Sequence, residues 1–341
     1  RPGTLACTAG PRISESPRPG VCYAPGLRHP WMTFIVSTVS RFLALFGLVM
    51  AAGTGSPLRA ETLPMLPPLN PEPTGLTIPG KFVWSDLFAE DIDGAKRFYS
   101  SLLGWTWRTF GSGVDEYHIA YTDDRPIAGL VYREARAESG AEAGWIVYAS
   151  AADPGALEAR VAAAGGRMLV SPIEVPYRGT HAVYRDGEGA LFGVLHSSTG
   201  DPGDYRAEYG EWVWTHLFSR DVRAAADFYS ELLGYESLDI ETTAEPNDFV
   251  LASGGHARAG IGAIGPDAPE GARPAWVGFL RVANVDAAAG LVEELGGSVL
   301  MLRDLNTFEG RVAVVADAAG ATFGLISLNL EAVWDNREER Q

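Results

Sequence analysis

The segment Phe82-Val-Trp-Ser-Asp-Leu-Phe-Ala-Glu-Asp91 occurs again, with changes, as Trp212-Val-Trp-Thr-His-Leu-Phe-Ser-Arg-Asp221. The two copies are offset by 130 residues, and Phe98-Tyr-Ser-Ser-Leu-Leu-Gly104 matches Phe228-Tyr-Ser-Glu-Leu-Leu-Gly234 with the same offset. Farther along the chain the offset is 131 residues. A slippage of one residue over a whole domain indicates a tandem duplication.

Each copy follows first the period of a strand and then that of a helix. The segment 82–89 alternates as a strand does. Asp91 is a suitable N-cap, the following apolar residues recur at helical spacing, and Gly104 ends the helix. Three short strands are expected next, at 105–110, 117–122 and 127–133.

A second round of the same order completes each repeat. A strand is expected over Trp145–Ser150, and Asp153 and Pro154 are expected to cap and open a helix that ends at Ala164. Three more strands are expected near 167–171, 180–185 and 190–197. The order βαβββ thus occurs twice in each repeat. This predicts an α+β fold, a tandem duplication of paired βαβββ modules.

Two motifs in each repeat resemble a known superfamily. Asp91–Gly104 and Asp221–Gly234 fit the pattern D-x-x-x-A-x-x-F-Y-x-x-x-L-G after a first strand. Asp186–Gly193 and Asp317–Gly324 both read D-x-x-G-A-x-F-G. With paired βαβββ modules, these motifs resemble the vicinal oxygen chelate superfamily of glyoxalases, bleomycin resistance proteins and extradiol dioxygenases.

The resemblance implies curled sheets whose concave face holds a small molecule, often chelated by a divalent metal. In metal-using members, the first strands of the paired modules supply two ligands and a final strand supplies a glutamate. The equivalent positions here hold side chains that cannot bind a metal: Trp84, Ile146 and Gly193, and in the second repeat Trp214, Val277 and Gly324. We therefore expect no metal at the usual site and no other cofactor.

The first strands also carry the candidate site. Alternation places Trp84 and Asp86 on one face, and Trp214 and His216 on the equivalent face of the second repeat. A tryptophan beside a polar side chain offers a flat apolar wall with one orienting group, so these four residues are predicted to bind a ligand. His216 is the candidate catalytic acid or base. The opposite face is expected to pack against the helix with Val83, Leu87, Val213 and Leu217.

Three functional hypotheses remain open. The first is a protein that binds a small organic molecule in a concave sheet cleft of each repeat, without a metal; if it is an enzyme, it is lyase-like or dioxygenase-like. The alternative is a metal-dependent lyase, isomerase or dioxygenase with unusual ligands such as Asp86, His216 or His118. The third is a structural duplication whose clefts are filled by its own tryptophans. Tyr99 and Tyr229 belong to the helix stripe and are expected in the core.

Charge and cysteine content exclude several functions. The formal net charge of −16 argues against nucleic acid and against docking to an anionic membrane, since both need a cationic surface. A small neutral or modestly polar ligand is the expected partner. The two cysteines, Cys7 and Cys22, lie near the N-terminus. No disulfide, thiolate nucleophile or cysteine metal site is therefore expected in residues 23–341.

The N-terminal residues resemble an export signal. Arg41 is followed by an apolar run, 42–52, and then by small and turn-forming residues. Residues 32–60 are predicted to be a signal peptide or an N-terminal membrane anchor, and 1–31 a non-native upstream extension. The protein is therefore expected to be exported, periplasmic or secreted.

The remaining boundaries follow from composition and from the repeat. They are a proline-rich linker at 61–80, a first glyoxalase-like domain at 81–198, a linker at 199–210, a second such domain at 211–329 and a polar tail at 330–341. A monomer whose two repeats pack as an internal pseudo-dimer is one expected arrangement, and the oligomeric state stays open.

Overall fold

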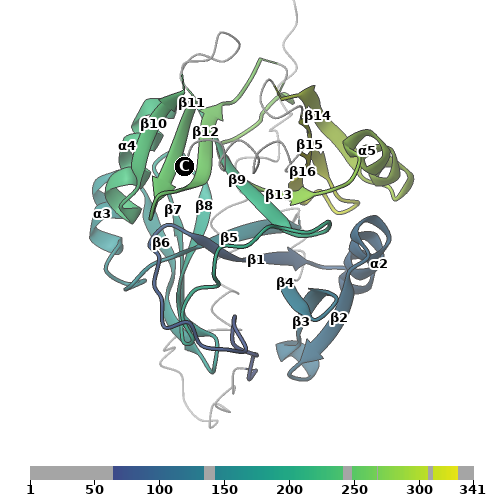
Figure 1. Ribbon diagram of the computed structural model, residues 1–341, viewed down its shortest axis with the longest axis horizontal. Helices are drawn as coiled ribbons and strands as arrows, with labels where there is room; N and C mark the ends of the chain where they lie inside the picture. Colours follow the sequence, from purple (N-terminus) through teal and green to yellow (C-terminus); the bar gives the residue numbers. More distant parts are fainter. Residues whose placement is uncertain (1–63, 134–142, 241–247, 267, 306–309, 329–341) are drawn as a thin grey trace, which may run out of the picture.

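The first repeat forms one mixed sheet with helices on one face (Figure 1). The computed structural model describes residues 64–133, 143–240, 248–266, 268–305 and 310–328, so that the predictions for 1–31, 32–60 and 330–341 lie outside the described residues. The elements are β1 (Phe82–Ala89), α2 (Ile92–Leu103), β2 (Thr106–Phe110), β3 (Tyr117–Thr122), β4 (Arg125–Tyr132), β5 (Gly144–Ser150), α3 (Glu158–Ala163), β6 (Arg167–Val175), β7 (Gly179–Arg185) and β8 (Leu191–Ser197). Within these ranges no helix has the length and apolar character needed to cross a membrane.

The second repeat has the same elements in the same order. They are β9 (Trp212–Ser219), α4 (Val222–Leu233), β10 (Glu236–Ile240), β11 (Asp248–Ser253), β12 (His256–Ala263), β13 (Ala275–Arg281), α5 (Val285–Glu294), β14 (Ser298–Asp304), β15 (Arg311–Ala316) and β16 (Thr322–Ser327). The strand order is β2-β3-β4-β1-β5-β8-β7-β6 in one sheet and β10-β11-β12-β9-β13-β16-β15-β14 in the other. The α+β fold with two βαβββ modules per repeat is confirmed.

The central pair of strands joins the two modules of each sheet. β1 runs antiparallel to β5 and parallel to β4, and β5 runs parallel to β8. The second sheet has the same pattern around β9 and β13. The first strands of the two modules therefore lie side by side, with the final strand of each module as the next neighbour.

The first helix of each repeat begins and ends where the sequence indicates. The Asp91 carboxylate accepts a hydrogen bond from the Gly94 N–H at 2.8 Å, and Asp221 accepts one from the Ala224 N–H at 3.0 Å. Gly104 ends α2 in the left-handed region, at φ 74°. Glycine adopts this conformation without the steric cost of a Cβ, which explains why the helix stops there.

The helix α3 is shorter than predicted. It begins at Glu158 rather than directly after Pro154. The Asp153 carboxylate accepts hydrogen bonds from the N–H groups of Gly155 and Ala156, so it caps a turn instead of the helix. Gly155 disfavours a helical conformation in this first turn.

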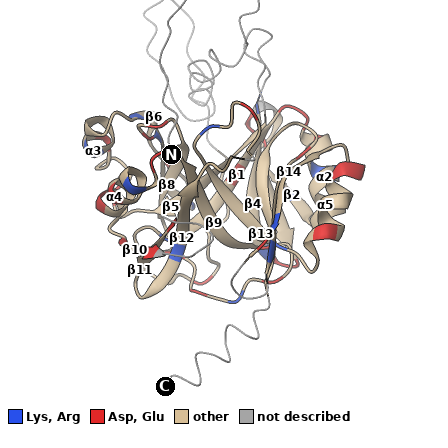
Figure 2. Cartoon of the chain, turned by 90° about the horizontal axis from the view of Figure 1, so that it is seen from above, with Lys and Arg blue, Asp and Glu red and all other residues tan. Residues whose placement is uncertain are grey.

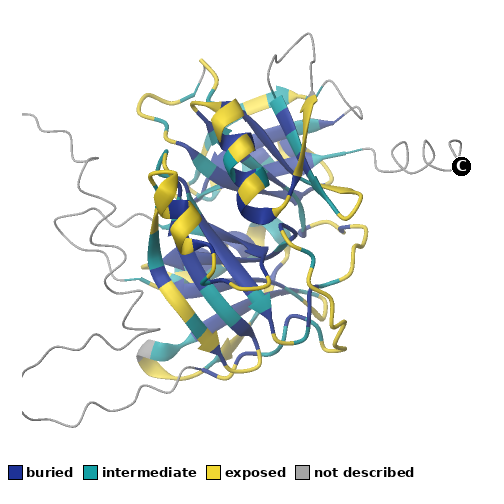
Figure 3. Ribbon diagram, turned by 90° about the vertical axis from the view of Figure 1, so that its left-hand side faces the viewer, coloured by how far each residue is buried: buried dark blue, intermediate teal, exposed yellow. Residues whose placement is uncertain are grey.

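The helix-bearing faces of the two repeats share two mixed cores. One core joins the second module of the first repeat to the first module of the second repeat, and the other core joins the remaining two modules. Figure 1 shows the result, with α3 and α4 on one side of the molecule and α2 and α5 on the other. Figure 3 shows that exposed residues of the helices face outward while the strands beneath are mostly buried.

Pseudo-symmetric contacts hold the repeats together. The Tyr99 hydroxyl donates to Asp317 at 3.0 Å, and the Tyr229 hydroxyl donates to Asp186 at 2.8 Å. Each aspartate belongs to the D-x-x-G-A-x-F-G turn, where its other oxygen accepts backbone N–H groups. Both tyrosines are buried, as predicted. The repeats thus pack as an internal pseudo-dimer.

The opposite face of each sheet stays within its own repeat. We call them the first tryptophan face, with Trp84, and the second tryptophan face, with Trp214. The prediction for Val83 and Val213 was wrong, because both pack on the tryptophan faces. An irregularity in each central strand pair, next to these valines, breaks the alternation that the sequence analysis assumed.

The two segments predicted as linkers are packed against the domains. Residues 64–80 contain no helix or strand, but Leu66 and Leu69 are buried on the first tryptophan face. In 199–210, Asp204 forms an ion pair with Lys81 at 2.7 Å, and Asp201 is buried. On the helices, acidic residues lie on the outside of the molecule, as Figure 2 shows for α2 and α5.

Candidate functional site

On the first tryptophan face, Asp86 is the centre of a buried hydrogen-bond network. Its carboxylate accepts a hydrogen bond from Trp84 Nε1 at 2.8 Å and another from the Tyr117 hydroxyl. Asp86 and Trp84 are each 5% exposed and Tyr117 is 3% exposed. A network that satisfies all its members in a buried site fixes their positions. Trp84 and Asp86 thus lie together as predicted, but they bind each other and β3.

Burial sets the protonation of this network. Burial raises the pKa of Asp86 above its usual value, while the hydrogen bonds from Tyr117 and Trp84 and the charge of Arg178 act in the opposite direction. Burial and the neighbouring Asp86 both raise the pKa of Tyr117 well above its usual value. Tyr117 therefore keeps its proton at neutral pH and donates a hydrogen bond to Asp86.

On the second tryptophan face the equivalent side chains are partly exposed. Trp214, His216 and Phe218 are all half-buried, and the rings of His216 and Phe218 lie 4.8 Å apart. Two glycines of β12 leave room for the imidazole. A Cβ on Gly260 would lie 2.5 Å from His216 Nδ1, and one on Gly262 would lie 2.8 Å from His216 Nε2.

His216 is neutral on this face at physiological pH. Burial, followed by the charge of Arg303, lowers its pKa to about 4. Asp248 lies on the same side, because its carboxylate also comes within 2.8 Å of the Cβ position of Gly262. Burial raises the pKa of Asp248. The imidazole can therefore accept a proton or a hydrogen bond, or donate its single N–H.

The metal-ligand positions of the superfamily do not fit a metal in either repeat. Tyr148, on β5 beside Trp84, fills the space where a final-strand side chain would stand, since a Cβ on Gly193 would lie 2.2 Å from its ring. Phe279 blocks Gly324 in the same way, also at 2.2 Å. In the part of the chain that the structure describes, no three His, Cys, Asp or Glu side chains come together as a metal site would require.

The unusual ligands of the metal-dependent alternative lie apart. His118 is on the helix face of β3, where its Nδ1 lies 3.1 Å from Lys96 and 2.8 Å from the Thr109 hydroxyl. Asp86 is on the opposite face of the same sheet, and His216 is in the other sheet. The structure therefore does not bring these three side chains together.

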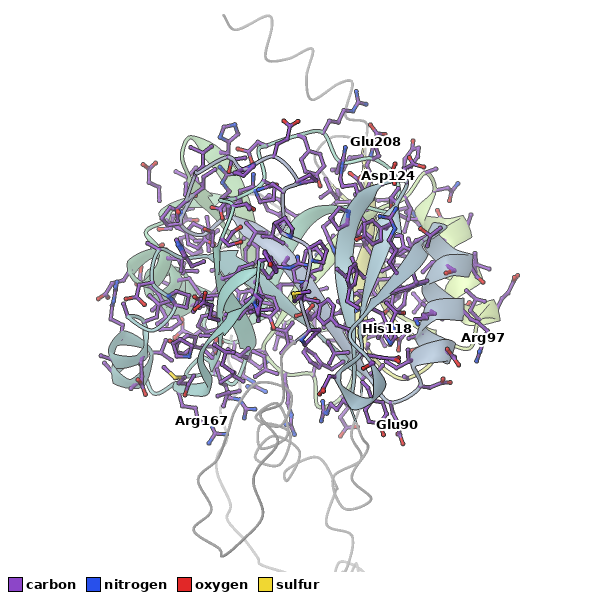
Figure 4. All side chains as sticks on the ribbon, turned by 90° about the horizontal axis from the view of Figure 1, so that it is seen from below. Glu90, Arg97, His118, Asp124, Arg167 and Glu208 are labelled. Carbon is purple, nitrogen blue, oxygen red and sulfur yellow. The ribbon has the colours of Figure 1, made fainter. Side chains whose placement is uncertain are left out.

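His118 lines a surface pocket beside α2. Figure 4 shows His118 and Glu90 on this side of the molecule. The pocket has a volume of about 420 Å³, and Glu90, Asp93 and Glu116 are among its walls. The acidic walls of this pocket are consistent with the negative net charge of the chain. The pocket does not extend to either tryptophan face.

Three residues that were not predicted from the sequence complete the first tryptophan face. Tyr117, Tyr148 and Arg178 come from β3, β5 and the turn after β6. Arg178 lies over the Trp84 ring, with its guanidinium carbon 4.1 Å from the ring centroid. Strand parity in β3 and β5 could have indicated the two tyrosines. No local signal marks an arginine in a turn.

The fold is that of a duplicated protein with two βαβββ modules in each repeat. The Glyoxalase/Bleomycin resistance protein/Dioxygenase superfamily model matches residues 212–325. Anthracycline biosynthesis protein DnrV from Streptomyces peucetius is 30% identical over 264 residues, which cover 73% of this chain and 94% of that protein. The chain therefore belongs to the glyoxalase/bleomycin resistance protein/dioxygenase superfamily.

Solved structures agree on the fold. The Mn(II)-bound glyoxalase from Novosphingobium aromaticivorans has a TM-score of 0.50 at 17% identity, over 74% of this chain and 83% of that one. The 2,2',3-trihydroxybiphenyl 1,2-dioxygenase from Sphingomonas wittichii also has a TM-score of 0.50, at 15% identity over 73% and 90%. These likenesses concern the fold alone.

Proposed function

We propose that the protein binds a planar aromatic small molecule on the second tryptophan face, without a metal at the superfamily's ligand positions. The observation that carries this proposal is the partial exposure of Trp214, His216 and Phe218 on one face. Buried Val277 and Phe279 form the floor beside them. Two aromatic rings around a neutral imidazole suit a flat ligand that carries a hydroxyl or carbonyl group.

The relatives suggest the class of ligand. DnrV and DauV are both named as anthracycline biosynthesis proteins, and DauV is 29% identical over 264 residues. We propose that the ligand is an anthracycline or a related polycyclic aromatic molecule. On such a molecule, His216 would accept a proton from a phenolic hydroxyl or donate to a carbonyl, which makes it the candidate acid or base if the ligand is turned over.

Fluorescence titration with an anthracycline tests this proposal. We expect the ligand to quench tryptophan emission, and we expect Trp214→Ala to weaken binding roughly fivefold or more, because a lost aromatic contact costs about 1 kcal/mol or more. His118→Ala is the matched control, since His118 lies on the helix face of the other repeat. Equal weakening by both variants, with melting temperatures unchanged, would contradict the proposal.

The second candidate function is a metal-dependent lyase, isomerase or dioxygenase. It is favoured by the Mn(II) in the glyoxalase of similar fold, and the residues at the usual positions argue against it. Elemental analysis of the purified protein distinguishes the two. One metal per repeat, lost together with activity on chelation, would establish the metal-dependent reading.

We also propose that the protein is exported. The support is the sequence pattern of Arg41 followed by the apolar run 42–52. Mass spectrometry of material from the native host should find an N-terminus after about residue 50, or a membrane-retained species. A soluble cytoplasmic protein that begins at Met32 would rule export out.

A further inference from the structure

Arg178 is a buried cation whose donors have no hydrogen-bond partner. Its side chain is 1% exposed, and Nε, Nη1 and Nη2 each lack an acceptor within hydrogen-bond distance. The guanidinium is stacked on the Trp84 ring instead. A cation–π contact offsets only part of the free energy that is lost when a guanidinium leaves water. An acceptor at this position would complete the interactions of the arginine.

Another buried arginine of the chain, Arg281, differs from Arg178 because at least one of its donors is used. Arg281 is 6% exposed, and its Nη1 donates to the Ala207 carbonyl at 2.7 Å. The Glu208 carboxylate lies 4.0 Å from the same nitrogen. Arg178 is less exposed and has neither kind of partner. The difference marks Arg178 as a group that is held ready for an acceptor from outside the chain.

The backbone around Arg178 is held in an unusual conformation. Tyr177 has φ of 64°, in the left-handed region that non-glycine residues seldom adopt, and Gly179 has φ of 121°. A Cβ on Gly179 would lie 2.0 Å from the His196 carbonyl oxygen. Ser198 fixes the turn, since its N–H donates to the Arg178 carbonyl at 3.1 Å. Strained turns of this kind persist where the surrounding structure imposes them, often at binding sites.

A second donor faces the same region. His181 Nε2 is buried and also lacks a partner, and the imidazole packs against Tyr148 with ring centroids 5.5 Å apart. Burial and the nearby Arg178 lower the pKa of His181 to about 3, so the ring is neutral and has one N–H to donate. Asp86 is not an acceptor for Arg178 either: its Oδ1 accepts from Trp84 and Tyr117, and no nitrogen of Arg178 has an acceptor within hydrogen-bond distance.

We infer that the first tryptophan face contains an enclosed site in which Arg178 binds the carboxylate of a small organic acid. A carboxylate matches the planar fork of a guanidinium in geometry and in charge. A dianion such as phosphate fits less well, since the Asp86 carboxyl lies close enough to interact electrostatically with Arg178. Leu66 and Leu69 cover the face, so the acid must be small.

Thermal shift and calorimetry with formate, acetate and benzoate test the site. We expect at least one of these acids to raise the melting temperature, because a ligand that binds only the folded state stabilises it. The neutral benzamide should give a shift smaller than that of benzoate. If none of the three acids raises the melting temperature, or if benzamide equals the best acid, the inference is wrong.

Variants of Arg178 separate binding from a structural role. Arg178→Met should weaken binding of the acid at least tenfold and leave the melting temperature of the ligand-free protein equal or higher, since it removes a buried guanidinium that makes no hydrogen bond. Arg178→Lys keeps the charge but loses the fork, and should bind the acid with intermediate affinity. A large fall in the ligand-free melting temperature of both variants would assign Arg178 a structural role and overturn the inference.

Arg303→Met is the matched control on the second tryptophan face, where Arg303 acts on His216. It should leave binding of the acid unchanged. The inference does not depend on the proposed anthracycline site, and the two can fail separately. Trp214→Ala should leave binding of the acid unchanged, and Arg178→Met should leave quenching by the anthracycline unchanged. Loss of acid binding in Arg303→Met would place the acid on the second face instead.

Discussion

The two tryptophan faces descend from one duplicated strand, yet they differ in polarity and in exposure. Trp84 and Asp86 are buried in a network with Tyr117, and Leu66 and Leu69 cover them. On the second face, Trp214 and His216 take the equivalent places and remain half-buried. Where β3 has Tyr117, β11 has Asp248. The first face is thus closed and internally bonded, and the second presents its aromatic side chains.

This difference shows that the two copies of a duplicated fold can diverge on one face while the other face stays the same in kind. The helix faces of both repeats are consumed in shared cores, so neither repeat is free to change them. The tryptophan faces lie outside those cores, and substitutions there cost the other repeat nothing. The first face is accordingly filled largely by its own side chains, whereas the second keeps part of its aromatic surface exposed.

The largest effect is expected from an attempt to separate the two repeats, which tests whether the two tryptophan faces belong to one folded unit. We expect cleavage at a protease site inserted in the exposed stretch 203–206 to leave the halves associated, because each mixed core takes half of its side chains from each repeat. The second repeat expressed alone should be insoluble or unfolded for the same reason. Size-exclusion chromatography under native conditions measures both. Halves that separate would show that each face belongs to an independent domain.

Removing the polar centre of each face should have unequal effects. Asp86→Ala leaves the Trp84 N–H and the Tyr117 hydroxyl without their acceptor, and should lower the free energy of unfolding by about 2–4 kcal/mol. His216→Ala, its matched control, should cost about 1 kcal/mol or less, because the half-buried ring has water nearby. Urea denaturation of both variants gives the two values. Similar losses would mean that the faces are equally closed.

The sequence predicted the strands and the first helix because their signals are local. The alternation in β1, the capping Asp91 and the terminal Gly104 all lie within one short segment. The shared face of Trp84 and Asp86 followed from the same alternation. Their partners did not, since Tyr117 is 31 residues from Asp86 and the turn that holds Arg178 is farther still.

The sequence also did not predict which residues cover the first tryptophan face. Prolines in 61–80 predicted a linker, and the described part of it, 64–80, contains no helix or strand; the composition says nothing about where such a segment packs. Leu66 and Leu69 are two apolar residues among many, and only the fold shows that they lie on Trp84. The irregularity beside Val83 was missed for a similar reason, since pairing between strands creates it.

The two faces should respond to pH in opposite directions. The pKa of His216 falls from 6.5 to about 4 on folding, so its contribution to stability is present above pH 6.5 and is lost as the pH falls toward 4. We expect this loss in the free energy of unfolding to be about 1–3 kcal/mol, allowing for the partial exposure of the ring. His216→Gln, which cannot be protonated, should therefore lose less stability than the wild type between pH 6.5 and 4. If the melting temperatures of the variant and the wild type fall equally over this pH range, the lowered pKa of His216 is contradicted.

Asp86 should make stability depend on pH in the direction opposite to that of His216. Folding raises its pKa above 3.8, so the folded protein holds this proton more tightly than the unfolded chain does. Its effect on stability is most favourable below pH 3.8 and becomes less favourable as the pH rises through the folded value. Stability of Asp86→Asn should accordingly decline less than that of the wild type as the pH rises from 4. Equal declines in the variant and the wild type would mean that folding does not raise the pKa of Asp86.

Chelation of metal ions should change stability least, because both tryptophan faces lack the metal ligands of the superfamily. Trp84 and Trp214 stand where ligands would, and the Tyr148 and Phe279 rings occupy the space of the final-strand glutamate in both repeats. A divalent ion held there by water and one stray side chain would bind too weakly to stabilise the fold. We therefore expect EDTA to leave the melting temperature unchanged.

The Mn(II)-bound glyoxalase of similar fold is the positive control for the chelation experiment. Its melting temperature should fall under the same EDTA treatment, because losing a ligand of the folded state lowers stability. A fall of the same size in this protein would show that one of its faces holds a metal through residues outside the superfamily's positions. His216 and Asp248, which both point toward Gly262, would then be the first side chains to replace, by His216→Gln and Asp248→Asn. Retention of the EDTA effect in both variants would move the metal away from the second tryptophan face.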